Sequence, residues 1–523
     1  MRRTRAYKWT AAAAAAIGLA AFAAAATSSP AGATQTLPLS HYSVAAPDDA
    51  FVPAGTAVNG DIACQRPAPD NRISTQLHCP TPQQMRHAYG IDELAQQGEG
   101  QTIVLVDSFG SPTAANDLAF FAQTFNLGTP DFEQVFPNGK PGFENGDGTA
   151  TGQGSGQNGP SSAAGWAGEA NLDVQWSFAM APKAHIVLLA TNTAETQGVP
   201  GLPAAMSAID WAINKYPSGT VFSMSFGTSE SAFAGTSAAQ QFAKYDETFK
   251  RGIAKGDTFF ASSGDNGSTG VERSHRQGTV SPDPQSSYPT ASPYVTSVGG
   301  TQRQIDWTWH PTGLDVPITS DPVTPRNPEW WDWTAGGNSE AVGQEPGFQL
   351  VTGGGPSNVY PRPSYQDSVA PVVGEHRGTP DLAWNMAING GAITYRSYFP
   401  GAAGPPSWVL FGGTSASSPQ VAAVVALANQ ARKEADKGPI GDLNKAIYSP
   451  SFDKAVAFRD IVRETYGPQP SATLASNRLW DITPDEPLTL DPVAGFATTP
   501  GYDMTTGFGS PAGQGFIDQV VAQ

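Results

Sequence analysis

The chain is poor in cysteine and in charged residues. It contains two cysteines among 523 residues, which excludes a small fold stapled by several disulfides. Charged residues make up 14% of the chain, against about 25% in an average globular protein. The 46 acidic residues outnumber the 29 lysines and arginines, so the net charge is −17 at pH 7. A surface of that sign repels phosphate groups, which argues against nucleic acid and anionic lipid as partners.

Long apolar runs are also scarce, and the clearest one lies at the amino terminus. The apolar residues 11–26 follow a basic stretch, and Ala-Gly-Ala at residues 31–33 has the small residues of a cleavage site. This pattern predicts a secretory signal peptide over residues 1–33, and therefore a secreted, extracellular protein. No later segment has the roughly 18 uninterrupted apolar residues of a membrane helix. We expect no membrane contact once the signal is removed.

Between the signal and the folded body, residues 34–79 form a distinct segment. This segment is rich in Ala, Pro, Asp and Gln and has weak periodicity, which favours an extended arm or a short prosegment. Both cysteines, Cys64 and Cys79, lie in it. Export permits a disulfide between them that would pin the arm, and two unpaired thiols are the alternative.

From residue 80 onward, segments of strand and helix character alternate. Short apolar runs predict strands at 101–107, 185–190, 221–225 and 258–262. Helices are expected from Pro82 to Tyr89, which has a capping-box start, and at 166–180, 204–215 and 238–255. This order is typical of an α/β fold with a mainly parallel central sheet and helices on both faces. Ligand sites in such sheets lie beyond the carboxyl ends of the strands.

The strongest chemical signal is Gly-Gly-Thr-Ser-Ala-Ser-Ser-Pro at residues 412–419. Small residues and hydroxyls at a loop-to-helix junction place the hydroxyl of Ser415 at a helix amino terminus. The backbone N–H groups and the helix dipole favour developing negative charge there. Ser415 is therefore a candidate nucleophile, and a helix cap without chemistry is the alternative.

A serine nucleophile needs a base, and histidine is scarce. None of the seven histidines stands in the His-Gly-Thr helix start of a subtilisin-type triad. Two carboxylates offer another base, because Glu169 and Asp173 lie four residues apart on one face of an apolar predicted helix. Such acids are costly to bury unless they share a proton or bind something. A third acid, Asp265, follows the strand 258–262 in a Gly-rich turn, where an ordinary turn aspartate is the alternative.

Several motifs over residues 80–523 resemble the sedolisins, secreted serine-carboxyl peptidases with a subtilisin-like fold. They are Glu169-x-x-x-Asp173, Ser-Met-Ser-Phe-Gly at 223–227, Ser-Gly-Asp-Asn-Gly at 263–267, Ala-Ser-Pro-Tyr-Val at 291–295 with Gly-Gly-Thr at 299–301, and Gly-Thr-Ser-Ala-x-x-Pro at 413–419. The resemblance implies Ser415 as nucleophile and Glu169 as general base and acid. It implies Asp173 as the partner of Glu169 and Asp265 as the stabiliser of the oxyanion. Ser225 and Gly227 match the segment that pairs with the peptide substrate in these enzymes.

A carboxylate base suits chemistry in acid. An imidazole with a pKa of about 6.5 is protonated at about pH 3–4, whereas a carboxylate with a pKa of about 4 still accepts a proton. Asp265 has the opposite task, because it must keep its proton to donate a hydrogen bond to the oxyanion. We therefore expect activity to fall as the pH rises towards neutrality.

A second set of motifs, near the carboxyl terminus, resembles the calcium site of the family. One structural calcium ion is implied, held in an all-oxygen cage. The implied ligands are the side chains of Asp481 and Asp503 and the carbonyl groups of Ile482, Thr499 and Gly501. Asp460 begins a similar motif, but its separation of 43 residues from Asp503 suits the family less well than the 22 residues from Asp481.

Two features depart from the family. The prodomain of the family is usually well over a hundred residues long. Residues 34–79 are therefore either the whole prosegment, or this protein folds without a prosegment. Asp107 stands where the family commonly has a glutamate that hydrogen-bonds the catalytic glutamate.

The main hypothesis is a secreted, monomeric, acid-acting serine endopeptidase with protein or peptide substrates, and tripeptidyl cleavage is left open. One alternative is a subtilisin-type peptidase that uses Asp107, a histidine and Ser415. The other is an inactive secreted binding protein on the same scaffold.

Overall fold

The computed structural model describes most of the chain beyond residue 80. The described residues are 42–45, 80–141, 160–194, 201–233, 238–270, 281, 283–302, 331–332, 351–386, 391–398, 407–461 and 495–523. They belong to one unit, Ala33–Gln523. The signal peptide expected at residues 1–33, and both Cys64 and Cys79, lie outside the described residues, so the signal and the disulfide stay predictions.

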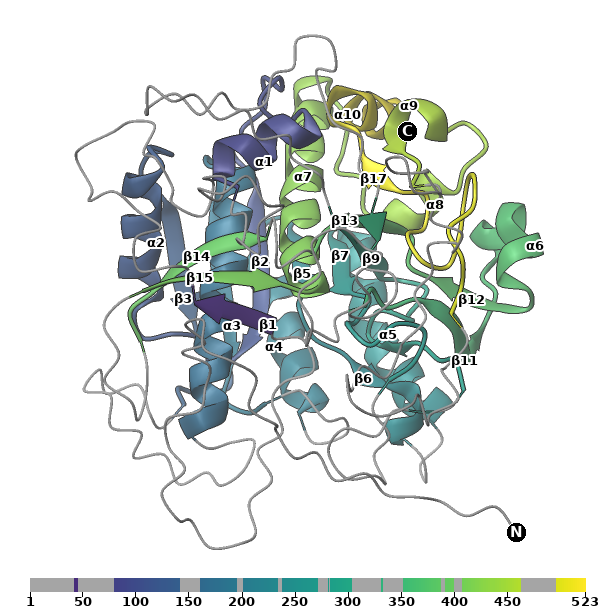
Figure 1. Ribbon diagram of the computed structural model, residues 1–523, viewed down its shortest axis with the longest axis horizontal. Coiled ribbons are helices and arrows are strands. Elements are labelled where there is room, and N and C mark those ends of the chain that lie inside the picture. The colour runs from purple at the N-terminus through teal and green to yellow at the C-terminus, as the bar shows by residue number, and fades with distance from the viewer. Residues whose placement is uncertain are drawn as a thin grey trace, which may run out of the picture. The chain divides into compact units, whose positions relative to one another are not determined.

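A central sheet of eight strands organises the described part of the chain (Figure 1). Its strands, in spatial order, are β10 (Trp331–Asp332), β9 (Thr296–Gln302), β7 (Thr258–Ser262), β5 (Val221–Met224), β2 (Thr102–Ser108), β4 (His185–Thr191) and β3 (Asp131–Val135), with β13 (Leu382–Asn385) also paired to β9. Only β10 runs antiparallel, and the other seven are parallel. The α/β class expected from the sequence is confirmed.

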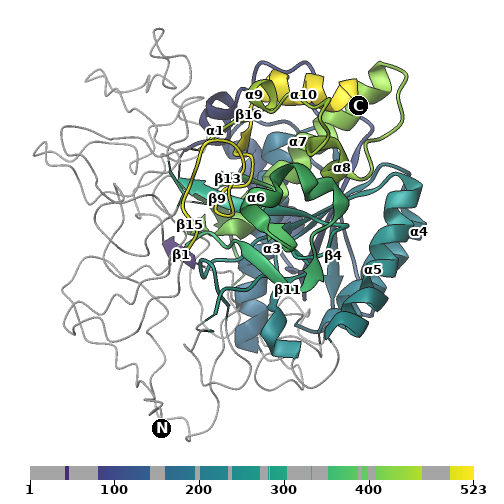
Figure 2. The ribbon, with the colours of Figure 1, turned by 90° about the vertical axis from the view of Figure 1, so that its right-hand side faces the viewer.

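Helices cover both faces of this sheet because its buried strands are apolar on both sides. Ile103 and Leu105 of β2 face one core, which includes residues of α2 (Ala114–Thr124), α3 (Pro160–Met180) and α7 (Thr414–Glu434). Val104 and Val106 face the other core, with α4 (Leu202–Lys215) and α5 (Ala238–Lys255). Figure 2 shows α4 and α5 side by side on their face.

The predicted elements match the observed ones closely. The helix α1 (Pro82–Tyr89) has the predicted capping box, in which Thr81 and Gln84 bond reciprocally. Two boundaries differ in ways that matter for the site. α3 begins at Pro160, earlier than the expected residue 166, because proline fits the first turn of a helix. β5 ends at Met224, so Ser225 lies in the loop beyond the sheet.

Smaller sheets and short helices surround the central layer. The arm contributes β1 (Tyr42–Ala45), which pairs antiparallel with β15 (Ser407–Gly412), and β15 pairs with β14 (Ala392–Arg396). The other pairs are β11 (Gly355–Pro361) with β12 (His376–Thr379), β6 (Thr228–Ser229) with β8 (Ser287–Tyr288), and β16 (Phe458–Arg459) with β17 (Ser510–Pro511). The short helices are η3 (Glu230–Phe233), η4 (Ser364–Val369), α6 (Ala370–Val373), α8 (Leu443–Ile447) and α9 (Lys454–Ala457), and α10 (Gly513–Ala522) ends the chain.

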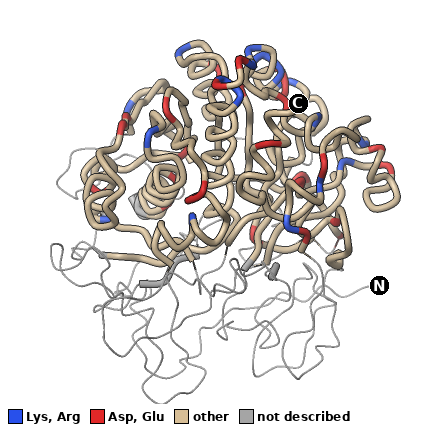
Figure 3. Tube along the Cα trace, turned by 90° about the horizontal axis from the view of Figure 1, so that it is seen from above, with Lys and Arg blue, Asp and Glu red and all other residues tan. Residues whose placement is uncertain are grey.

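Charges are sparse along the described trace (Figure 3). Among the helices that the structure describes, none combines the length and the apolar character needed to cross a membrane.

Candidate active site

Ser415 lies where the chain turns from a strand into a helix. β15 ends at Gly412, and Gly413 has a φ of 107°, a conformation that side-chain-bearing residues rarely adopt. The N–H of Gly413 donates to the carbonyl of Met386 (2.7 Å), which holds this turn against the end of β13. Ser415 is the second residue of α7 and is fully buried. The predicted position at a helix amino terminus is confirmed.

Asp265 lies at the same helix start. It follows β7 and is fully buried. Its Oδ1 accepts hydrogen bonds from the backbone N–H (2.7 Å) and the hydroxyl (2.9 Å) of Thr414, the residue before Ser415. The hydroxyl of Thr414 in turn accepts from the N–H of Gly264 (3.0 Å). Thr414 thus joins the strand end to the helix start, a role that the sequence analysis did not assign.

Three buried acids form a second group beside α7. Glu169 and Asp173 lie on α3 and are fully buried, and Asp107, near the end of β2, is 1% exposed. Burial raises the pKa of Asp107 well above its usual value, and the charge of Glu169 adds to this. Burial also raises the pKa of Asp173, with further contributions from Asp107 and Glu169. The expected clustering of acids on one face of the helix is present, and no cation contributes to either shift among the described residues.

Ser225 connects the two groups. It lies just beyond the end of β5, and its hydroxyl donates to the carbonyl of Ser415 (3.3 Å). The same side chain lies close enough to Asp173 to lower its pKa, against the larger effect of burial. Gly227 lies two residues further on, beside Ser287. Segments from α3, β5 and α7 therefore meet at one point, at the carboxyl end of the sheet.

The position of α3 depends on polar contacts that the sequence analysis missed. Asn171 donates to Asp117 of α2 (3.1 Å), and the side chain of Gln175 bonds both backbone groups of Tyr395 (2.7 and 2.9 Å). Ser177 donates to the carbonyl of Pro419 on α7 (3.1 Å). These three polar residues stand among apolar residues on a helix that was predicted to be buried. Because buried polar groups need hydrogen-bond partners, this pattern could have predicted contacts with other elements.

The histidines of the described part of the chain lie elsewhere. His87 contacts Asp92 (2.7 Å), and His185 at the start of β4 contacts Asp131 and Glu133 (3.0 and 3.2 Å). His376 is exposed on β12. Within the part that the structure describes, no histidine is therefore placed to serve Ser415, as the subtilisin-type alternative requires.

A loop near the carboxyl terminus gathers acids and backbone groups. Asp503 is buried, and it accepts hydrogen bonds from the N–H groups of Thr499 (3.0 Å), Thr505 (2.9 Å) and Thr506 (2.8 Å). Burial raises its pKa to about 7. Asp481 and Ile482 lie outside the described residues.

Asp460 also contacts this loop. Its separation from Asp503 in the sequence had made it a less favoured calcium ligand than Asp481. The pairing of β16 with β17 brings Asp460 to the loop, where its carboxylate accepts from the N–H of Gly501 (2.7 Å). Burial raises the pKa of Asp460. Within the described residues no group of three or more His, Cys, Asp or Glu side chains is arranged to hold a metal ion. Two carboxylates at a loop rich in carbonyl groups nevertheless have the oxygen chemistry that suits calcium.

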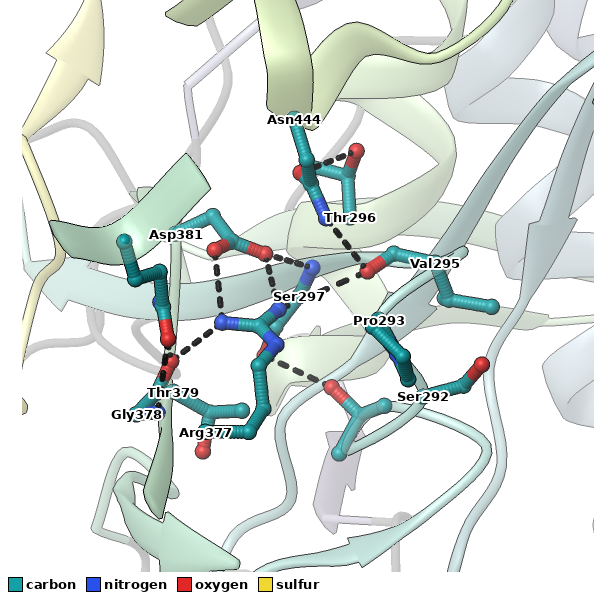
Figure 4. A network of polar contacts seen from close by, with 12 residues as sticks. Ser292, Pro293, Val295, Thr296, Ser297, Arg377, Gly378, Thr379, Asp381 and Asn444 are labelled. Carbon is teal, nitrogen blue, oxygen red and sulfur yellow. Dashed lines mark hydrogen bonds and ion pairs between the residues drawn. The ribbon is translucent and has the colours of Figure 1, made fainter. Parts of the chain in front are cut away.

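A buried ion pair joins Arg377 on β12 to Asp381, the residue before β13 (Figure 4). Arg377 and Asp381 are both fully buried, and the guanidinium donates to both carboxylate oxygens (2.8 and 2.5 Å). The same carboxylate accepts from the N–H of Ser297 (2.8 Å), which ties the pair to β9. Nearby, Asn444 donates to the carbonyl of Val295 (3.0 Å). Here every charge has a partner.

Comparison with known proteins identifies the family. The model of the subtilase family matches residues 148–443, more than half of the chain. Kumamolisin of Bacillus sp. (strain MN-32) is 29% identical over 440 residues, which are 83% of this chain and 62% of kumamolisin. Tripeptidyl-peptidase 1 of Canis lupus familiaris is 25% identical over 301 residues, covering 56% of this chain and 41% of that protein. The chain thus spans less than two thirds of the length of these relatives.

Solved structures give the same fold. A Pseudomonas sedolisin, crystallised with two molecules of pseudo-iodotyrostatin, superposes with a TM-score of 0.55 at 21% identity. The match covers 85% of this chain and 98% of that one. The subtilisin-like fold expected from the motifs is confirmed. The protein therefore belongs to the subtilase family, and its similarity to kumamolisin and to the Pseudomonas sedolisin is consistent with the sedolisins.

Proposed function

We propose that the protein is a serine-carboxyl peptidase that hydrolyses peptide bonds in proteins through an acyl-enzyme on Ser415. The observation that carries this proposal is the junction at Ser225, whose hydroxyl donates to the backbone of Ser415 and whose side chain lies close enough to Asp173 to lower its pKa. A hydroxyl at a helix start thereby lies beside buried carboxyl groups, which is what a carboxylate base requires. The family membership supports the same activity.

In the proposed reaction, Glu169 accepts the proton of the Ser415 hydroxyl as its oxygen attacks the peptide carbonyl. The tetrahedral oxyanion is stabilised by a hydrogen bond from the protonated carboxyl of Asp265 and by the start of α7. Glu169 then gives its proton to the leaving amine, and an ester on Ser415 remains. Water hydrolyses this ester with Glu169 again as the base, which releases the acid and restores Ser415.

Asp173 and Asp107 support the base by holding protons close to Glu169. Their raised pKa values keep them protonated in acid, and two neighbouring carboxyl groups do not both ionise cheaply. As the pH rises, Asp107 and Asp173 lose these protons and negative charge accumulates beside the base. We therefore propose that the enzyme acts in acid.

A cleavage assay with the full chain tests the proposal. Alkylated, fluorescently labelled casein is incubated with the enzyme between pH 2 and 7, in the presence of calcium. We expect cleavage in acid that Ser415→Ala abolishes and that the exposed control Ser451→Ala retains. An optimum above pH 7 that depends on a histidine would favour the subtilisin mechanism instead. No cleavage at any pH, with the arm removed, would favour an inactive binding protein.

We also propose a structural calcium ion at the carboxyl-terminal loop. Asp503 and the carbonyl groups of Thr499 and Gly501 would hold it, together with either Asp460 or the motif Asp481-Ile482. A bound cation would neutralise the carboxylates that burial otherwise penalises. The ion would stabilise the loop and takes no part in the reaction.

The remaining proposals concern secretion, oligomeric state and the type of cleavage. The signal at residues 1–33 would direct secretion, and the mature enzyme would act as a monomer on protein or peptide substrates. Residues 34–79 would form the arm that precedes the catalytic domain. Endopeptidase and tripeptidyl cleavage are distinguished by the lengths of the first products in the casein assay.

A further inference from the structure

The segment from Ser225 to Glu230 leaves the central sheet and runs along the proposed substrate site. It continues from β5 through β6, which pairs with β8. At its far end the N–H of Glu230 donates to the carbonyl of Ser286 (3.2 Å). The N–H of the next residue, Ser231, donates to the side chain of Gln285 (3.0 Å). One side of the segment is thus held by residues 285–288.

The side chain of Glu230 holds the segment from another direction. Its carboxyl group is buried, with the residue only 3% exposed. One oxygen accepts the backbone N–H of Asn358 (2.6 Å), and the other accepts the hydroxyl of Ser357. That hydroxyl oxygen also accepts the N–H groups of Val359 (3.1 Å) and Tyr360 (2.9 Å). The contact therefore joins the segment to a well-bonded turn of β11.

The same segment packs against the residues that follow Asp265. A Cβ atom placed on Gly270 would lie 1.9 Å from the hydroxyl oxygen of Ser229, so a larger residue there would force Ser229 to move. The N–H of Gln285 donates to the carbonyl of Ser268 (2.9 Å). A shift of the segment would therefore disturb both the substrate side and the oxyanion side of the site.

We propose that Glu230 is a positioning residue for substrate binding, which fixes the segment 225–227 by tying its end to β11. This inference rests on the proposed peptidase function, since it takes that segment as the one that pairs with the peptide. Glu230 itself does not touch the reacting atoms. Its effect on catalysis acts through the backbone of the segment, and its loss should weaken binding more than it slows the chemical step.

The protonation of Glu230 should make this support depend on pH. Burial raises its pKa to about 7, against the hydrogen bonds from Ser357 and Asn358. The ionisable side chains packed around it are Tyr360 on β11 and, beyond it, Tyr288 on β8 with Asp246 and Lys250 on α5. In acid the carboxyl group is neutral and comfortably buried. Near neutrality it ionises at a buried position, where loss of solvation opposes the charge, so the segment should be held less well.

Two variants of Glu230 and one matched control test the inference. Glu230→Ala removes both contacts, whereas Glu230→Gln keeps an acceptor for Asn358 and cannot ionise. Asp257→Asn is the control, because Asp257 is also fully buried and also accepts two backbone N–H groups (3.1 Å each), from Gly219 and Thr220. Asp257 lies at the amino ends of β5 and β7, at the opposite edge of the sheet.

The assay uses an internally quenched peptide taken from a casein cleavage site, with blocked ends and no residue that ionises between pH 4 and 7. At pH 4 we expect Glu230→Ala to raise KM about tenfold with kcat changed less than about threefold. Glu230→Gln should match the wild type at pH 4 and should lose the rise in KM between pH 5 and 7. Asp257→Asn should leave KM within about twofold at both pH values.

An unchanged KM in Glu230→Ala would overturn the inference, and so would a wild-type pH dependence of KM in Glu230→Gln. The second result decides the matter if the alanine variant does not fold. Binding of the same peptide is also measured in a Ser415→Ala background, where Glu230→Ala should weaken Kd about tenfold. This separates the two proposals, because a failed peptidase hypothesis removes cleavage by the wild type, whereas a failed role for Glu230 leaves cleavage intact and Kd unchanged.

Discussion

Two buried charged regions of this protein are built in opposite ways. Around Arg377 and Asp381, each buried charge meets its opposite, and the carboxylate has further N–H and hydroxyl donors. Beside Ser415, the acids Asp107 and Asp173 are buried, and the charges that act on their pKa values are those of other acids. The first arrangement belongs to the scaffold. The second is costly at neutral pH and is compatible with folding only if protons are held there, which points to function.

The comparison also predicts how stability changes with pH. The folded-state pKa values of Asp107 and Asp173 are raised, so the folded protein binds these protons more tightly than the unfolded chain. Their contribution to stability is complete below the unfolded pKa, near 4, and is lost as the pH rises through the folded pKa. Glu230, with a pKa of about 7, and Asp246, with a pKa of about 6, act in the same direction. We therefore expect these four acids to stabilise the folded state more in acid than at neutral pH.

The largest expected effect is a loss of activity when an acid beside Ser415 is replaced. Glu169→Gln keeps the shape of the side chain but cannot accept the proton of Ser415, so we expect kcat to fall by about 10²–10⁴-fold. The peptide assay at pH 4 measures this, with the exposed Glu434→Gln at the end of α7 as control. Full activity in Glu169→Gln would contradict the carboxylate-base mechanism.

The next largest effect is a loss of stability when the buried ion pair of Arg377 and Asp381 is broken. Arg377→Met leaves Asp381 buried without its cation, which should lower the free energy of unfolding by about 3–5 kcal/mol at pH 6. The exposed pair of Arg251 and Asp210 provides the control, and Arg251→Met should cost less than about 1 kcal/mol. Urea unfolding measures both variants. Equal losses in the two would mean that burial of the pair does not matter.

Removal of calcium should have an intermediate effect. A ligand present at about 100 times its Kd stabilises the folded state by about 2.7 kcal/mol, and this is lost in a calcium chelator. Thermal unfolding with calcium, with magnesium and with chelator measures the loss. Asp503→Asn should remove the response to calcium. Comparison of Asp460→Asn with Asp481→Asn then shows which acid completes the site, since only the ligand variant should lose the response.

The smallest expected effect is a change in stability that has opposite signs in the two regions. Asp173→Asn keeps the shape of the side chain but cannot ionise, so at pH 7 we expect it to stabilise the protein by about 1–2 kcal/mol while activity falls. At pH 4, where Asp173 already holds its proton, stability should hardly change. Asp381→Asn should destabilise the protein at pH 7, because it weakens a real ion pair. Urea unfolding at both pH values compares them, and destabilisation by Asp173→Asn at pH 7 would contradict the contrast.

Local patterns in the chain were sufficient for most of the architecture. The short apolar runs predicted β2, β4, β5 and β7 of the central sheet but not β3, β9, β10 or β13, and the capping box predicted α1, because the periods of strands and helices are local properties. The four-residue spacing placed Glu169 and Asp173 on one face of α3 for the same reason. The glycines around Ser415 marked the sharp turn into α7.

Contacts between distant segments were not accessible in this way. Glu230 bonds a backbone group 128 residues away, and Asp460 joins a loop 41 residues away through the pairing of β16 with β17. Sequence spacing, which favoured Asp481 over Asp460, carries no information about such pairing. Whether a buried acid meets a cation, another acid or a backbone amide depends on which remote elements pack beside it, and electrostatic energy follows those distances rather than the order of residues.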